Sequence, residues 1–97
     1  MSAPCPVFGF VVEWELAETL SSDQVRDVYL AFVRDMIEPR GLECEERSSG
    51  RRSSFVVRSE ASQATDLDRE AVEAWTATRP EIVSATIGPL LDFASAA

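Results

Sequence analysis

One amphipathic stretch, between Leu20 and Leu42, limits the fold of this 97-residue chain more than any other feature. Six apolar residues recur at i, i+3, i+4, i+7, i+8 and i+11, the spacing of a helix that packs one face against a core. They are Val25, Val28, Tyr29, Phe32, Val33 and Met36, and we expect Asp27, Ala31 and Arg34 on the opposite side. The pattern therefore predicts one long helix that covers a larger apolar surface.

Both ends of this predicted helix carry local signals. Ser21 is a favourable N-cap, and Gln24 lies three residues later, where its side chain can complete a capping box. At the other end, Pro39 disfavours the α conformation at Glu38, and Gly41 permits the chain to turn. We therefore expect the helix to begin after Ser21 and to end before Pro39.

Alternating apolar and polar residues predict four strands. The first has the strongest pattern, with aromatic and aliphatic side chains at every second position from Phe8 to Leu16. A polar, Gly-containing turn over residues 47–52 joins the second and third strands into a hairpin. The predicted strands are residues 8–16, 42–45, 54–58 and 83–87, and residues 90–93 are expected to be irregular or strand-like.

A second helix is predicted from Thr65, an N-cap with Asp68 three residues later. Arg79-Pro80 marks its end, since the residue before a proline is disfavoured in a helix. We expect one apolar face made of Leu67, Ala71, Ala74, Trp75 and Thr78, with Val72 beside it.

The resulting order, β-α-β-β-α-β, predicts an α+β, ferredoxin-like sandwich with both helices on one face of a four-stranded sheet. The first and third strands are expected in its centre, and Trp14 and Trp75 between sheet and helices. One domain covers residues 8–93, between tails at 1–7 and 94–97. The other face of the sheet is then acidic; its expected residues are Glu13, Glu15, Glu43 and Glu45, with Arg58 as a nearby ion-pair partner.

The residue types argue against catalysis and against a bound cofactor or metal. The chain contains no histidine, its four glycines form no phosphate-binding motif, and its two cysteines are far apart in sequence. Neighbouring glutamates disfavour a reactive thiolate at Cys44. A Cys5–Cys44 disulfide is one alternative, but a reducing cytoplasm favours free thiols. We expect a cytoplasmic, non-enzymatic protein with no membrane segment and no small-molecule substrate.

The charges suggest two interaction surfaces. The formal net charge is −8, so contact with a nucleic acid requires a local basic cluster. Arginines in and near the predicted turn form such a cluster, and they are Arg40, Arg47, Arg51 and Arg52. An ordinary solvated turn is the alternative. The four glutamates of the predicted acidic face form a second surface, which suits a basic protein.

The same residues resemble the YggL family of small bacterial proteins over about Gly9 to Asp92. The first half of the likeness comprises Gly9-Phe10, Val12, Trp14, Ser21, Val25, Phe32, Ile37-Glu38-Pro39 and Gly41-Leu42. The second half comprises Phe55-Val56, Ala64-Thr65, Arg69-Glu70-Ala71-Val72, Trp75, Arg79-Pro80, Gly88-Pro89-Leu90 and Asp92.

This resemblance implies association with the large (50S) ribosomal subunit and no enzymatic activity. The family typically has a basic segment before its first strand, whereas this chain has only Met1 to Val7 there. An acidic adaptor or inhibitor that binds a basic protein is therefore the alternative. If the protein dimerises, we expect the uncharged fourth strand or Leu90-Leu91 at the interface, since Glu43 to Glu46 protect the other edge.

Overall fold

A central strand, β1 (Phe8–Leu16), organises the sheet in the computed structural model, which describes residues 7–59 and 63–93. It pairs antiparallel with β3 (Arg52–Arg58) on one side. On its other side it pairs with β4 (Ile82–Ile87) and with the short β5 (Leu91–Asp92). β2 (Glu43–Ser48) pairs with β3, which gives the order β2-β3-β1-β4. The central positions of the first and third strands are confirmed, and β5 adds a fifth strand where we expected four.

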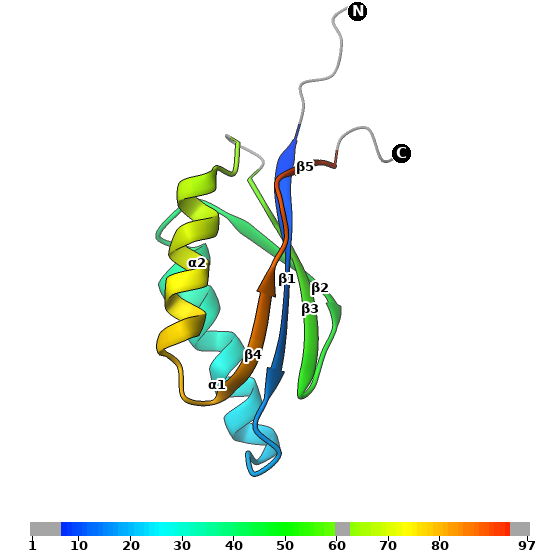
Figure 1. Cartoon of the computed structure of the whole chain (residues 1–97), viewed down its shortest axis with the longest axis vertical. Helices are drawn as coiled ribbons and strands as arrows, with labels where there is room; N and C mark the ends of the chain where they lie inside the picture. The colour runs from blue at the N-terminus through cyan, green and yellow to red at the C-terminus, as the bar shows by residue number, and fades with distance from the viewer. Residues whose placement is uncertain (1–6, 60–62, 94–97) are drawn as a thin grey trace, which may run out of the picture.

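The helical segments lie against one face of this sheet (Figure 1). They are α1 (Ser22–Phe32), the π-helical turn η1 (Val33–Ile37) and α2 (Asp66–Thr78). Both predicted capping boxes are present. The Gln24 N–H donates to Ser21 Oγ over 3.2 Å, and the Ser21 N–H donates to Gln24 Oε1 over 2.8 Å. These local bonds fix where each helix begins.

The first helix is not one continuous α-helix. Its α geometry ends at Phe32, and in the following turn the Glu38 N–H donates to the Val33 carbonyl over 2.9 Å, five residues back. We expected Pro39 to exclude the α conformation at Glu38. This prediction is wrong, because Glu38 has α-helical backbone angles (φ −62°, ψ −48°). Pro39 donates no N–H and its ring crowds the carbonyl four residues earlier, and the wider π turn accommodates both effects.

The buried face of this segment also differs from the expected one. Ala31, placed on the solvent side by the sequence pattern, is 6% exposed, and Ile37 is 4% exposed. Val28, Ala31 and Phe32 form the buried i, i+3, i+4 set of α1. The π turn then brings Ile37 into the core and leaves Met36 half-buried beside it.

An aromatic cluster around Trp14 joins the sheet to both helices. The centroid of its indole lies 5.2 Å from that of Phe32, 4.7 Å from that of Phe55 and 6.2 Å from that of Trp75. Trp14 is buried as predicted, whereas Trp75 is only half-buried. The Trp75 Nε1–H reaches the surface and donates to Asp35 Oδ2 over 3.2 Å, which attaches α2 to η1.

The inner face of α2 is rotated from the predicted one. Its buried residues are Asp68, Val72 and Thr76, whereas Leu67 is 70% exposed. Apolar periodicity alone cannot predict that a carboxylate is turned inward. Asp68 is buried because its oxygens accept hydrogen bonds from two other residues, as described below.

Candidate functional site

The predicted basic turn lies at one end of the β2–β3 hairpin. Gly50 adopts a left-handed conformation (φ 107°) there, and the Ser53 hydroxyl donates to its carbonyl over 2.7 Å. Arg47 and Arg52 are exposed near the ends of the two strands, and Arg51 precedes β3. The hairpin thus brings three of the four predicted arginines to one end of the sheet.

Arg51 has a structural contact within the fold. Its Nη2 donates to the carbonyl oxygens of Glu18 and Leu20, over 3.0 and 3.1 Å. These bonds hold the connection between β1 and α1 against the hairpin. A substitution at Arg51 therefore changes that connection as well as the surface charge.

Arg47 and Arg52 are freer to meet a partner. Arg47 makes no ion pair among the residues that the structure describes. Arg52 Nε lies 3.7 Å from Glu15 Oε2, and the Arg52 side chain is 83% exposed. A pair of this kind contributes at most about 1 kcal/mol, so Arg52 can exchange Glu15 for another anion at small cost.

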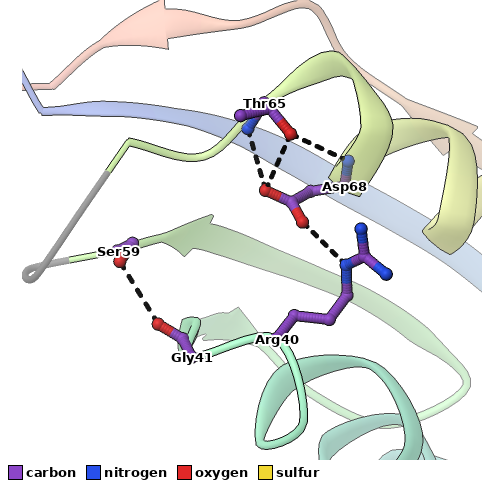
Figure 2. Close-up of polar contacts among 5 residues, drawn as sticks. All are labelled: Arg40, Gly41, Ser59, Thr65 and Asp68. Atoms are coloured by element: carbon purple, nitrogen blue, oxygen red, sulfur yellow. Dashed lines mark hydrogen bonds and ion pairs between the residues drawn. The ribbon is translucent and has the colours of Figure 1, made fainter.

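Arg40 lies apart from the turn. It precedes β2, whereas the turn follows β2, so the six residues of the strand, about 20 Å in length, separate them. Arg40 Nε donates to Asp68 Oδ1 over 2.7 Å (Figure 2). The other Asp68 oxygen accepts from the N–H and hydroxyl of Thr65, over 2.9 and 3.2 Å. The structure gives Arg40 a role in attaching α2, outside the predicted cluster.

The structure adds Arg26 to the surroundings of the turn. A groove of about 570 Å³ lies between α1 and the hairpin, and its lining includes Arg26 and Arg51. Apolar side chains of Tyr29 and Leu30 line it as well, and Leu30 is 49% exposed. Arg26 is exposed on α1, and only the docking of this helix beside the hairpin brings it there. No motif in the sequence indicates that proximity.

The predicted acidic residues share the sheet face that the helices leave open. Glu13 and Glu15 alternate with the core residues of β1, and the strand register places Glu43 and Glu45 on the same face of β2. β3 lies between the two pairs, and the register places Glu43 beside one end of β3 and Glu15 beside the other, so the four carboxylates are spread along the sheet. Arg58 on β3 is the predicted ion-pair partner, with Nη2 3.2 Å from Glu45 Oε2.

Cys44 is a free, half-buried thiol on β2. Burial is the main cause that raises its pKa to about 12; the charge of Glu46 adds a little, and a hydrogen bond with Tyr29 acts in the opposite direction. The thiol is thus protonated at neutral pH and is a poor nucleophile, as predicted. The main cause of its raised pKa is burial, however, and not the neighbouring glutamates that the sequence suggested. Cys5 lies outside the described residues, so the disulfide alternative is not tested.

Two other kinds of site can be assessed over the described parts of the chain. No group of three or more metal-ligating side chains occurs among residues 7–59 and 63–93. In the same ranges, no helix has the length and apolar character needed to cross a bilayer.

A comparison with protein families identifies this chain. The family described as YggL 50S ribosome-binding protein matches residues 6–94, which is nearly the whole sequence. No curated protein matches the chain. No solved structure matches it either. The match includes every helix and strand described above, and the chain therefore belongs to the YggL 50S ribosome-binding protein family.

Proposed function

We propose that this protein is non-enzymatic and associates with the large (50S) ribosomal subunit in the cytoplasm. The observation that carries the proposal is the family match over residues 6–94. The residues themselves support the absence of catalysis, since the one described thiol is held protonated and the chain has no histidine. We also propose a ferredoxin-like classification, supported by the strand order β2-β3-β1-β4 with β5 as an addition.

We further propose that the β2–β3 turn contacts ribosomal RNA through Arg47 and Arg52. Both side chains are exposed, and neither holds another part of the chain as Arg51 and Arg40 do. Contact between a guanidinium and a phosphate releases counterions, so the affinity should fall steeply with salt. The acidic character of the remaining surface restricts such contact to this end of the sheet.

Co-sedimentation with purified 50S subunits over a salt series tests both proposals. The variant Arg47→Ala/Arg52→Ala should bind more weakly, and its salt dependence should fall by about two phosphate equivalents. Arg34→Glu is the matched control, because it also lowers the net charge by two at a residue whose side chain is 70% exposed.

The outcomes separate the two proposals. If the wild-type protein does not co-sediment at low salt, 50S association is wrong for this chain. If the wild type and the double variant bind with the same salt dependence, the subunit contact lies elsewhere. An equal loss in Arg34→Glu would show that the total charge matters and that the turn has no special role.

The alternative function, an acidic adaptor or inhibitor, rests on the open face of the sheet. Glu13 and Glu43 are exposed there, and among the described residues neither has an ion-pair partner. A basic polypeptide suits this face by charge. Glu13→Gln/Glu43→Gln should weaken binding to a lysine-rich peptide if the alternative holds, while Arg47→Ala/Arg52→Ala should not.

A further inference from the structure

The outer edge of β4 differs in its chemistry from the opposite edge of the sheet, which is formed by β2. β4 lies at the end of the sheet order, so among the described strands only β1 pairs with it. The ten residues from Ile82 to Leu91 contain no ionisable side chain, although the chain carries 26 charged residues among 97. An uncharged edge of this kind is open to pairing with another strand.

The backbone of β4 presents hydrogen-bonding groups to that open side. The Gly88 N–H donates to the Val11 carbonyl over 2.8 Å, which fixes which residues face β1. In an antiparallel ladder the backbone N–H and C=O groups of alternate residues point to the same side, so those of Ser84 and Thr86 also point towards β1. The N–H and C=O groups of Ala85 therefore point away from the sheet, and they match the same groups on another antiparallel strand.

The side chains on this edge are exposed. Val83 is 66% exposed, and Leu91 of β5, which continues the same side of β1, is 48% exposed. The opposite edge of the sheet is different, since β2 carries charges at Glu43, Glu45 and Glu46. Charged edge strands resist pairing with other chains, and β4 lacks this protection.

A shallow groove beside the edge provides room for a second strand and its side chains. It has a volume of about 300 Å³ and lies between α2 and β4. Its α2 side is formed by Glu73, Thr76 and Ala77, and its β4 side by residues 82–85. The small side chain of Ala77 leaves space for the approach of a neighbouring copy.

We propose that β4 pairs antiparallel with β4 of a second copy of this chain across a two-fold axis. A two-fold axis brings the same segment to both sides, and an antiparallel edge is complementary to itself. Two copies with a formal charge of −8 repel each other over most of their surface, which favours contact at an uncharged edge. A basic partner is drawn instead to the glutamates of the open face.

The geometry predicts a weak dimer. Six residues give an edge about 20 Å long, too little for a standard interface of about 800 Å² per copy. A standard interface would bury about one-eighth of the 6123 Å² surface of each copy. Because the edge of β4 is too short to bury this area alone, the exposed flank of α2 must contribute to the interface as well. This dimer is independent of the proposed ribosome contact, which lies at the β2–β3 turn.

Sedimentation velocity of the full 97-residue chain, from about 1 μM to about 1 mM, tests the proposal. We expect a reversible dimer in the wild type and at least a tenfold weaker association in Val83→Glu. Leu67→Glu is the matched control, because it adds the same charge at a leucine that is 70% exposed, against 66% for Val83. Leu67 lies near the start of α2, six residues before the first residue that lines the groove, so this variant should dimerise as the wild type does.

A second variant tests the backbone pairing. Ala85→Pro removes an N–H that faces away from β1, so it should also abolish the dimer while leaving the β1–β4 ladder intact. Circular dichroism verifies the fold of each variant, and Val83→Glu decides alone if Ala85→Pro does not fold. The proposal is overturned if the wild type is monomeric throughout, if Val83→Glu dimerises normally, or if Leu67→Glu weakens the dimer equally.

Discussion

Replacing Asp68 by alanine would measure how strongly α2 is attached to the segment that follows η1. The carboxylate accepts three hydrogen bonds, one from Arg40 and two from Thr65, and its side chain is 12% exposed (Figure 2). Its removal therefore takes away both the capping box of α2 and a contact between two distant parts of the chain.

The expected cost follows from these contacts. Loss of a capping interaction costs about 1 kcal/mol, and a hydrogen bond to a charged group contributes about 1.5–3 kcal/mol. The lower part of this range applies to Arg40, because its side chain is 33% exposed and water can replace the lost acceptor. Asp68→Ala should thus lower the free energy of unfolding by about 2–3 kcal/mol, a large share of the total for a domain of this size.

Asp66→Ala is the matched control in the same turn of α2. Asp66 is also a carboxylate near the helix N-terminus, but its side chain is 73% exposed, and within the described residues its one ion pair is with Arg69, three residues later. This change should cost about 0.5 kcal/mol. Urea unfolding followed by tryptophan fluorescence would compare the two. If both substitutions cost the same, the buried contacts of Asp68 do not stabilise the fold as described.

Two further predictions concern the strands. Gly9→Ala should destabilise the protein by about 1–3 kcal/mol, because an added Cβ would lie 2.5 Å from the Val57 carbonyl oxygen. Gly88→Ala is the control: the nearest atom to its added Cβ lies at 3.3 Å, so it should lower the melting temperature less. A larger decrease for Gly88→Ala than for Gly9→Ala would contradict this packing. Burial raises the pKa of Cys44 from 9.0 to about 12, so the unfolded state loses this proton first and stability should decline from about pH 9 towards pH 12. Urea midpoints measured over that pH range should decline less in Cys44→Ala than in the wild type. If the midpoints of both proteins decline equally with pH, a group other than Cys44 is responsible.

Features that depend on neighbouring residues in the sequence were predictable. The alternation in β1 and the two capping boxes need only a few adjacent side chains, and the structure has them where the sequence indicates. Gly41, with φ 65°, occupies the turn that its lack of a side chain suggests. In each case the local preference and the tertiary structure agree.

Features that depend on distant contacts were not predictable. The apolar spacing continues from α1 through η1, so nothing in it indicates a π turn at Val33. The face of α2 was misassigned because Asp68 is stabilised in the interior by Arg40, 28 residues away. For the same reason the sequence grouped Arg40 with the hairpin arginines and gave no reason to place Arg26 beside them.

The position of β1 has a consequence for synthesis and folding. This strand leaves the ribosome before any of its three partners, β3, β4 and β5, and one of its sides stays unpaired until β4 and β5 follow. The backbone hydrogen bonds of Val7 also depend on this late segment, because its N–H donates to Asp92 and its carbonyl accepts from the N–H of Phe93. Contacts between such distant residues slow folding. The sheet can therefore close only after residue 93 has been added, and shorter nascent chains expose the edge of β1 on which the finished sheet depends.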